Sequence, residues 1–419
     1  MNVTITPSKL SGTITPPPSK SQAHRLIIAA ALAEGESVLT NIALSQDISA
    51  TISCMEELGA EFLLEGSRLT VRGAGISERS PMVRSARPRM DCGESGSTLR
   101  FLIPVALAAR GGGTFTGRGR LMERPQQPYF DLFSQKGIAC ERAGSTLTVR
   151  GFLAPGDYAL PGNVSSQFIT GLLYALPLLP GESILRVTTP LESADYVAMT
   201  LQALEQFGIT VERTGPLAYR IPGGQVYRPR SLAVEADWSQ AAFWYAAAGL
   251  GNAVTVEGMN PNSLQGDKEI LRWGRMIAGQ PMEGGGRSSV CIDVSPCPDL
   301  VPPAAAWGAG MKGELHLCNA GRLRLKESDR LAAVSATLTA MGARVEEGAA
   351  GLTIYGTDTL AGGCTVDCWG DHRIAMMAAI AATRCAAPVT LAGAQCVAKS
   401  YPAFWDDYEA LGGQIVRTD

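Results

Sequence analysis

Apolar residues along this chain follow first a helical and then a strand period, and the same order returns six times. Each copy predicts an amphipathic helix that ends at an apolar residue and a glycine, followed by two short alternating strands. Two copies read MEELGAEFLLEGSRLTVRG around Gly59 and LFSQKGIACERAGSTLTVRG around Gly137. The equivalent glycines of the other copies are Gly208, Gly279, Gly342 and Gly412, and the copy at Gly279 is degenerate while the one at Gly412 is truncated. Glycine fits a helix C-terminus because it adopts the left-handed conformation without a Cβ clash.

A second recurrent segment alternates with the first and predicts buried helices. It has a polar start, an alanine-rich helix, a turn that contains glycine, and an extended segment. Two of these helices, RFLIPVALAA (100–109) and RIAMMAAIAA (373–382), are apolar on every side, which is typical of a helix without a solvent face. Each repeat therefore predicts the order strand, helix, strand, helix, strand, strand.

Such a repeat cannot bury both faces of its helices alone, so the copies should pack together. A chain of 419 residues exceeds what one core usually holds. We therefore predict an α/β fold of two domains with three repeats each, buried parallel helices inside and strands outside. Parallel helices would bring the polar starts of each domain to one surface. These starts are SKSQAHR (19–25), GESGSTLR (93–100), SSQ (165–167), DWSQ (237–240), PCPD (296–299) and GDHR (370–373).

The polar starts carry cations where a helix disfavours them. Ordinary N-capping explains Ser165, Asp237 and Asp371. It does not explain the positively charged members, which are Lys20, Arg25, Arg100 and Arg373. The helix dipole repels a cation at its N-terminus, so these positions predict a bound anion that the cations and the backbone N–H groups stabilise together.

Candidate chemistry also lies in the segment 322–330 and at Asp299 and Arg124. In RLRLKESDR (322–330), Lys326 and Arg330 are four residues apart and would share a helix face, with Glu327 also in reach of Arg330. A salt-bridged surface helix explains that segment equally well. An N-cap role explains Asp299 and does not exclude acid/base chemistry. A cationic cleft would hold both Asp299 and Glu327 ionised, which suits a proton acceptor. Arg124, which precedes Pro125, is expected in an extended conformation.

Composition excludes several classes of function. A formal net charge of −3 argues against a general nucleic-acid or membrane surface. The ten cysteines form no CxxC pair, which indicates reduced thiols rather than a metal site. No P-loop or dinucleotide fingerprint occurs, so neither a cofactor nor a metal is implied. The N-terminus lacks a signal-peptide pattern and the apolar runs are shorter than a membrane span, so we expect a soluble cytoplasmic protein.

Seven motifs occur in one order: PPPSKSQAHR, SGSTLR, RLMERP, NVSSQF, LRLKESDR, DHRIAM and VAKSYP. In this order the chain closely resembles the 5-enolpyruvylshikimate-3-phosphate synthase family from about Ser8 to Pro402. The resemblance implies a two-domain inverse α/β barrel, with residues 1–18 and 230–419 in one domain, 19–229 in the other, and the active site in the cleft between them. It also implies a monomer.

The implied reaction joins the 5-hydroxyl of shikimate 3-phosphate to C2 of phosphoenolpyruvate and releases phosphate through a tetrahedral intermediate. This is a step of the shikimate pathway of aromatic amino acid biosynthesis. The implied catalytic residues are Asp299 as proton acceptor, Glu327 and Lys20. The implied shikimate 3-phosphate contacts are Lys20, Ser21, Arg25, Ser165, Ser166, Gln167, Ser193, Tyr196, Asp299 and Lys326. The implied phosphoenolpyruvate contacts are Lys20, Gly96, Arg124, Gln167, Arg330, Arg373 and Lys399.

Three positions depart from the family's motifs. Pro18 stands where glycine is frequent, and Glu94 and Arg322 stand where asparagine is common. Glu94 beside a dianion is unfavourable unless an arginine offsets its charge.

Alternative functions remain open at this point. A UDP-N-acetylglucosamine enolpyruvyl transferase shares the repeat fold but carries a cysteine in the loop before its arginine–proline pair, and residues 111–125 contain none. A catalytically silent anion-binding homologue would be expected to lose Asp299, Glu327 or Lys20, and all three are present. An RNA-end-processing protein would require a basic face with exposed aromatic side chains.

Overall fold

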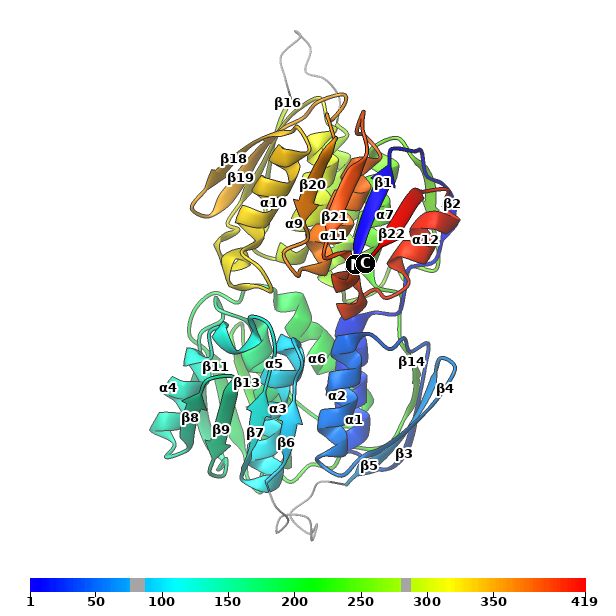
Figure 1. Cartoon of the computed structure of the whole chain (residues 1–419). Helices are drawn as coiled ribbons and strands as arrows, with labels where there is room; N and C mark the ends of the chain where they lie inside the picture. The colour runs from blue at the N-terminus through cyan, green and yellow to red at the C-terminus, as the bar shows by residue number, and fades with distance from the viewer. Residues whose placement is uncertain (76–86, 280–287) are drawn as a thin grey trace. The chain divides into compact units, whose positions relative to one another are not determined.

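The computed structural model describes residues 1–75, 87–279 and 288–419, and the chain folds into two compact units (Figure 1). The central unit consists of Pro18–Glu235. The terminal unit combines Met1–Pro17 with Ala236–Asp419. Each unit has its own continuous hydrophobic core.

The described residues of the central unit form three four-stranded sheets with one pattern of pairing. One sheet has the order β14 (Ser231–Ala233), β3 (Glu34–Thr40), β5 (Arg68–Ala74), β4 (Glu61–Glu65). The next has the order β6 (Arg89–Asp91), β7 (Gly112–Thr116), β9 (Thr146–Arg150), β8 (Ala139–Ala143). The third has the order β10 (Gly156–Leu160), β11 (Ser183–Val187), β13 (Ala218–Ile221), β12 (Glu212–Gly215). In each sheet the first pair is parallel and the others are antiparallel.

The helices of the central unit alternate between buried and half-buried. The buried ones are α1 (Lys20–Leu32), α3 (Gly96–Arg110) and α5 (Ser166–Ala175), which lie inside the unit (Figure 1). The amphipathic ones are α2 (Gln46–Glu56), α4 (Gln127–Gln135) and α6 (Ala194–Gln206), with 3-10 turns η2 (Leu121–Glu123) and η3 (Leu176–Leu178). The all-round apolar sequence of the buried helices thus corresponds to burial on every side.

The terminal unit repeats the same pattern. One sheet has the order β16 (Ser288–Asp293), β17 (Gly313–Cys318), β19 (Gly351–Tyr355), β18 (Arg344–Gly348). Another has the order β20 (Cys364–Asp367), β21 (Val389–Ala392), β1 (Asn2–Thr6), β22 (Gln414–Thr418), so both chain ends lie in one sheet. The third pairs β15 (Ala253–Val256) with β2 (Ser11–Ile14). The strands expected after Gly279 for the degenerate repeat fall partly on residues 280–287, outside the described residues.

The terminal unit also alternates its helices. The buried ones are α7 (Trp238–Gly249), α9 (Val301–Ala309) and α11 (His372–Ala382). The others are α8 (Ile270–Ile277), α10 (Arg330–Ala340) and α12 (Phe404–Ala410), with 3-10 turns η4 (Gly266–Glu269), η5 (Pro298–Leu300), η6 (Gly321–Leu325) and η7 (Ala394–Lys399). The predicted α/β architecture of repeated units with buried helices is confirmed.

The second crossing between the units lies between Glu235 and Ala236. The resemblance placed it between 229 and 230. The crossing comes later because β14 adds a parallel strand to β3, with Leu232 opposite Leu39. The Glu235 N–H also donates to Gln22 Oε1 at 2.6 Å, which holds this segment on the central unit.

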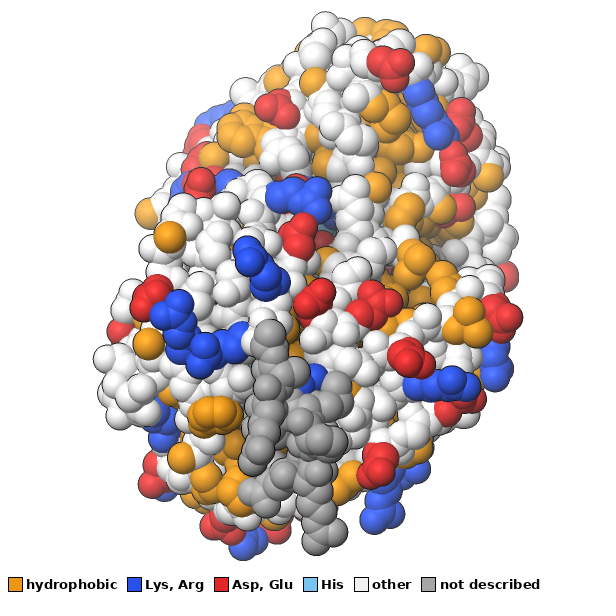
Figure 2. All heavy atoms as spheres, turned by 60° about the horizontal axis from the view of Figure 1, so that its bottom comes forward, with side chains coloured by type: hydrophobic (Ala, Val, Ile, Leu, Met, Phe, Trp, Pro, Cys, Tyr) orange, Lys and Arg blue, Asp and Glu red, His pale blue; other side chains and the backbone are white. Residues whose placement is uncertain are grey.

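Charges of both signs are interspersed on one face of the molecule (Figure 2). Figure 2 shows Lys and Arg side chains among Asp and Glu side chains on the face that it displays. Within the described ranges, no helix has both the length and the apolar character that crossing a membrane requires.

Candidate functional site

Side-chain bonds in the central unit join the first turns of its helices. Lys20 Nζ on α1 lies 2.7 Å from Asp47 Oδ2 on α2. Gln167 Nε2 on α5 donates to Ser97 Oγ on α3 at 3.0 Å. Arg25 connects α1 to α6. The first two bonds join first turn to first turn, so the N-termini of α1 and α2 lie side by side, as do those of α3 and α5.

Arg25 is a buried cation with neutral partners. Its side chain is 3% exposed, its Nε donates to Thr200 Oγ1 at 2.9 Å, and its terminal nitrogens donate to the carbonyls of Ser21 (2.6 Å) and Tyr196 (2.8 Å). The guanidinium also lies over the ring of Phe101. Burial lowers the pKa of Arg25, although an arginine remains protonated. A buried charge without an ionic partner favours an anionic ligand.

Arg124 lies over the start of α3, and Gly96 makes room for it. Arg124 is 6% exposed. A Cβ on Gly96 would lie 2.6 Å from a terminal nitrogen of Arg124 and 2.9 Å from its Cζ, which is closer than real side chains approach. Ser95 caps the same helix by accepting from the Thr98 N–H at 3.1 Å. This corner therefore combines a guanidinium with helix N–H groups, both of which suit a carboxylate or phosphate.

The orientation of Gln167 is fixed from two sides. Its Oε1 accepts from Arg100 at 2.8 Å, while its Nε2 donates to Ser97. Arg100 also lies over the ring of Phe168, with 4.7 Å between its Cζ and the ring centroid. Arg100 thus positions the side chain that the resemblance assigns to both substrates.

Three serines of the predicted site lie at the starts of α5 and α6, and Ser21 lies in the first turn of α1. Ser165 caps α5 by accepting from the Gln167 N–H at 3.3 Å, and Ser166 is the buried first residue of that helix. Ser193 precedes α6 in the left-handed conformation, with φ 56°. Their hydroxyls add hydrogen-bonding capacity to the first turns of α5 and α6.

Asp299 is the centre of an ionic cluster in the terminal unit. Its Oδ1 lies 2.8 Å from Arg330 and 3.3 Å from Lys326 Nζ, and its Oδ2 lies 3.4 Å from Arg373. Burial would raise the pKa of this carboxyl, but Arg373, Lys326 and Arg330 outweigh burial and hold the pKa well below its usual range. Asp299 is therefore held ionised, which suits a proton acceptor.

Arg330 binds three carboxylates at once. Besides Asp299, it donates to Glu327 Oε2 at 2.6 Å and from Nε to Asp371 Oδ2 at 2.7 Å. Burial opposes its charge, but Asp371, Glu327 and Asp299 hold its pKa above the ordinary value. Asp371 also caps α11 by accepting from the Arg373 N–H at 3.0 Å. One arginine thus connects the starts of α10, α11 and η5.

The helix-face prediction for Lys326 and Arg330 is wrong. Asp329 caps α10 by accepting from the Ala332 N–H at 3.1 Å, so the helix begins at Arg330 and Lys326 precedes it. Asp299 does not cap α9 either, because it lies inside η5 and its carboxylate is committed to the cations. The ionised-acceptor interpretation of Asp299 is the one that this geometry supports.

Lys399 reaches the start of α11 from η7. Its Nζ donates to the Gly370 carbonyl at 2.6 Å, and the side chain is buried. Arg322, one of the three departures, donates to the Ser295 carbonyl at 2.8 Å and so ties the loop before Asp299 to η6. Glu94, another of the three departures, packs against Gly119. A Cβ on Gly119 would lie 2.5 Å from the Oε2 atom of Glu94.

The sequence did not single out Asp47 or Asp267. Asp47 pairs with Lys20 across two helices. Asp267 is buried in η4, and burial followed by the charge of Asp299 raises its pKa to about 6, while Arg373 acts in the opposite direction. Two carboxyls of one cluster thus have pKa values displaced in opposite directions, as acid and base groups of active sites often do. Neither residue stands in a motif, so only their spatial neighbours reveal them.

The predicted site residues divide between the two units. The central unit holds Lys20, Ser21, Arg25, Gly96, Arg124, Ser165, Ser166, Gln167, Ser193 and Tyr196. The terminal unit holds Asp299, Lys326, Glu327, Arg330, Arg373 and Lys399. Among the residues with described positions, no group of His, Cys, Asp and Glu side chains is arranged to hold a metal ion.

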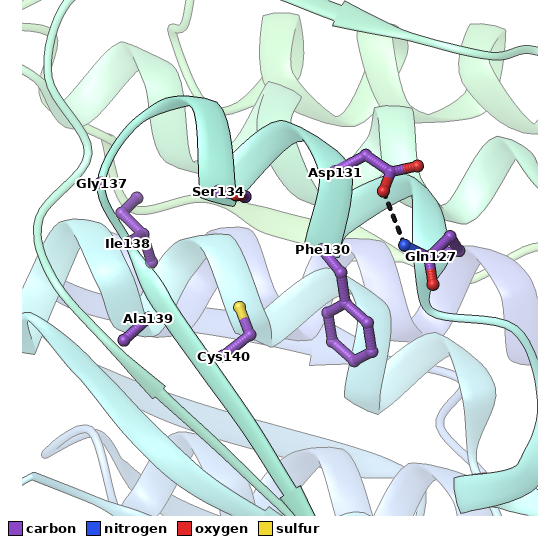
Figure 3. A pocket seen from close by; sticks show the side chains of 8 residues that line it. All are labelled: Gln127, Phe130, Asp131, Ser134, Gly137, Ile138, Ala139 and Cys140. Carbon is purple, nitrogen blue, oxygen red and sulfur yellow. Dashed lines mark hydrogen bonds between the residues drawn. The ribbon is translucent and has the colours of Figure 1, made fainter.

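A pocket on the central unit lies apart from these residues. It has a volume of about 570 Å³ and lies between α4 and β8 (Figure 3). Phe130 and Cys140 line it, together with Gln127, whose amide donates to Asp131 Oδ1 at 2.6 Å. None of the predicted site residues lines this pocket.

Comparison with known proteins gives one consistent family. The sequence model of the protein family described as EPSP synthase (3-phosphoshikimate 1-carboxyvinyltransferase) matches residues 5–408 of this chain. A 3-phosphoshikimate 1-carboxyvinyltransferase of Clostridium kluyveri is 42% identical over 426 residues, covering 99% of this chain and 98% of that protein. The protein of the same name from Clostridium acetobutylicum is 44% identical over 425 residues, with 99% and 98% covered.

Solved structures show the same fold. EPSP synthase from Acinetobacter baumannii has a TM-score of 0.78 at 24% identity and covers 99% of this chain and 100% of its own. The enolpyruvyl transferase NikO from Streptomyces tendae has a TM-score of 0.77 at 16% identity, with 100% and 98% covered.

Proposed function

The chain belongs to the EPSP synthase family, and from that membership we propose that it transfers the enolpyruvyl group of phosphoenolpyruvate to the 5-hydroxyl of shikimate 3-phosphate. The observation that carries this proposal is the ionised carboxylate of Asp299 held among Lys326, Arg330 and Arg373. A half-buried carboxylate that is kept ionised is suited to accept the proton of a hydroxyl nucleophile.

Shikimate 3-phosphate is assigned to the first turns of the central unit together with two groups of the terminal unit. Arg25, whose own partners are neutral, supplies the positive charge, and Gln167 is already oriented by Arg100 and Ser97. The other groups assigned to this substrate are Lys20, Ser21, Ser165, Ser166, Ser193, Tyr196, Asp299 and Lys326.

Phosphoenolpyruvate is assigned to a set of cations from both units. Arg124 beside Gly96 would bind one of its anionic groups. The remaining groups are Lys20, Gln167, Arg330, Arg373 and Lys399. Arginine and lysine at fixed positions stabilise the charge that develops on the departing phosphate without any later reorganisation.

The steps of the reaction follow from these positions. Asp299 accepts the proton of the 5-hydroxyl of shikimate 3-phosphate. At the same time the oxygen of that hydroxyl bonds to C2 of phosphoenolpyruvate, and a proton adds to C3. The tetrahedral intermediate then loses phosphate from C2 and a proton from C3, which restores the double bond. Glu327, Lys326 and Lys20 are assigned to the proton transfers at C3 and phosphate. Holding two substrates at attack distance supplies about 7–11 kcal/mol of such a barrier.

The test is phosphate release from phosphoenolpyruvate with different acceptors. We expect release with shikimate 3-phosphate and none with UDP-N-acetylglucosamine, and we expect Lys20→Ala to abolish turnover while its circular dichroism spectrum stays native. Release with the nucleotide sugar alone would identify the other enolpyruvyl transferase. Binding of shikimate 3-phosphate without any release would identify a silent anion-binding homologue.

Compartment and assembly form part of the same proposal. All ten cysteines lie in described residues and are thiols, which fits a reducing compartment such as the cytoplasm. We assign a monomer, which size-exclusion chromatography with light scattering would test.

A further inference from the structure

Two cysteines face each other on neighbouring strands of the terminal unit. The Sγ of Cys291 on β16 lies 3.2 Å from the Sγ of Cys318 on β17. The strands are parallel, with Cys291 opposite His316 and Asp293 opposite Cys318. The two thiols are therefore diagonal neighbours on one face of the sheet.

That face of the sheet is accessible to solvent. Cys291 is exposed and Cys318 is half-buried. The adjacent residues Ile292 and Leu317 point the other way into the core, with exposed fractions of 2% and 1%, as the alternation of strand side chains requires. A small reagent dissolved in water can therefore reach Cys291 first.

Other thiols of this protein are also close together but are inaccessible. Cys54 and Cys92 are hydrogen-bonded and 1% and 0% exposed. Cys368 and Cys396 are likewise bonded, at 1% and 6% exposure. These buried pairs are internal controls, because they share the proximity of the exposed pair and lack its accessibility.

We propose that Cys291 and Cys318 form a reversible disulfide when the protein meets a hydroperoxide. The Cys291 thiolate attacks one peroxide oxygen, the O–O bond breaks, and the other oxygen leaves as hydroxide and takes up a proton. Cys318 then attacks the sulfur of the resulting sulfenic acid, the S–O bond breaks, and a second water leaves. Two thiols lose two electrons and two protons, and hydrogen peroxide gains both.

The two thiols differ in environment as the two reaction steps require. The hydrogen bond to Cys291, followed by burial, raises the pKa of Cys318 to about 11, so Cys318 keeps its proton at neutral pH. The exposed Cys291 is then the sulfur that reacts first, and Cys318 resolves the sulfenic acid.

The bond needs little movement and should stabilise the unit. A disulfide S–S distance is about 2.0 Å, so the sulfurs need to approach by about 1 Å, which side-chain rotation can supply. The hydrogen bond from the Val294 N–H to the Cys318 carbonyl, at 3.0 Å, already fixes the strand ends. The two cysteines are 27 residues apart, so the bond closes a loop that includes α9 and constrains the unfolded chain.

The experiment maps disulfides in the full-length protein. Reduced protein is treated with hydrogen peroxide, remaining thiols are alkylated in denaturant, and the peptides are analysed by mass spectrometry without reductant. We expect a Cys291–Cys318 cross-linked peptide that dithiothreitol cleaves, whereas both buried pairs are recovered as alkylated thiols. The midpoint of thermal unfolding should rise by several degrees after oxidation.

A matched variant provides the control. In Cys318→Ser, the same peroxide treatment should convert Cys291 to sulfinic acid and leave the unfolding midpoint unchanged. The proposal fails if wild-type Cys291 is recovered as sulfinic acid without a cross-link under conditions that oxidise it in Cys318→Ser. It also fails if Cys291 cross-links to a different cysteine of the folded protein. Should Cys318→Ser not fold, Cys291→Ser serves the same purpose, because it should then show neither the cross-link nor the stabilisation.

Discussion

Arg25 and Arg330 are both buried arginines, yet their surroundings are opposite. Arg330, in the terminal unit, binds the carboxylates of Asp299, Glu327 and Asp371. Arg25, in the central unit, donates to a hydroxyl and two backbone carbonyls, and among the described residues no carboxylate is bonded to it. Burial opposes the charge of both. The carboxylates raise the pKa of Arg330, whereas the pKa of Arg25 is lowered.

The difference separates two uses of a buried charge. Removing an ion from water costs several kcal/mol unless partners of opposite charge compensate it. Arg330 is compensated within the protein, so it can hold Asp299 and Asp371 in place before any ligand binds. Arg25 lacks that compensation, and an anionic ligand would supply it. In our proposal the terminal unit contributes an assembled proton acceptor, and the central unit contributes attraction for the substrate.

The largest expected effect is on the proton acceptor itself. Asp299→Asn keeps the shape of the side chain but removes the base, so we expect kcat to fall about 10²–10⁴-fold, the range typical of general-base catalysis. Phosphate release at saturating substrates measures this change. Asp329→Asn is the control, because asparagine also caps a helix, and its kcat should stay near that of the wild type. A wild-type kcat in Asp299→Asn would remove Asp299 from the mechanism.

A pair of variants tests the comparison directly through stability. Arg330→Met would leave three carboxylates without their shared partner, so the free energy of unfolding should fall by about 3–5 kcal/mol. Arg25→Met removes a cation that has no ionic partner and should change that free energy much less. Urea denaturation followed by circular dichroism measures both. Equal losses in the two variants would show that the two arginines have the same structural role.

Much of the fold was predictable from the sequence because it repeats. The Leu-Gly and Met-Gly pairs at Gly59 and Gly342 mark helix ends, and apolar runs such as 373–382 require burial whatever their neighbours are. The position of β14 was harder to predict from the sequence. Its three residues carry no hydrophobic pattern of their own, and they pair with β3, which is far away in the sequence. Local periodicity thus fixes elements, whereas pairing partners set the boundary between units.

The site was predictable where cations oppose a helix dipole. Arg25 and Arg373 stood out for that reason. The carboxylates Asp47 and Asp267 did not, because they reach the cations through contacts between helices rather than through spacing. Asp371 was predicted as an N-cap, but its bond to Arg330 on another helix was not. The start of α10 was misplaced because Asp329 caps this helix by accepting from the Ala332 N–H, which leaves Lys326 before the helix.

Substrate binding provides the third test. If Arg25 awaits an anion, Arg25→Met should weaken binding of shikimate 3-phosphate about 10- to 100-fold, the loss expected for hydrogen bonds to a charged group. Isothermal titration calorimetry measures the dissociation constant. Arg25→Lys keeps the positive charge but loses the forked guanidinium donors. Its affinity for shikimate 3-phosphate should therefore lie between that of the wild type and that of Arg25→Met. Unchanged affinity in Arg25→Met would refute the assignment of Arg25 to this substrate.

The smallest expected effect concerns Asp267, a carboxyl near Asp299 whose pKa is raised by burial and by the charge of Asp299. Its pKa of about 6 in the folded protein exceeds the value of about 3.9 in an unfolded chain, so the folded state holds this proton more tightly. Stability from this group is therefore fully present below about pH 4 and is lost as pH rises to about 6. Asp267→Asn cannot ionise, so it should lack that decline and should exceed the wild type by on the order of 1–3 kcal/mol at pH 7. Urea denaturation at a series of pH values measures the difference.

Asp293→Asn is the control. Burial would raise the pKa of Asp293, but hydrogen bonds from Ser295 outweigh burial and lower this pKa, so Asp293 titrates below the range of pH 4 to 6. Parallel profiles for wild type and Asp267→Asn between pH 4 and 7 would mean that Asp267 is compensated like Arg330, and the contrast between the two kinds of buried charge would then not extend to the carboxyls.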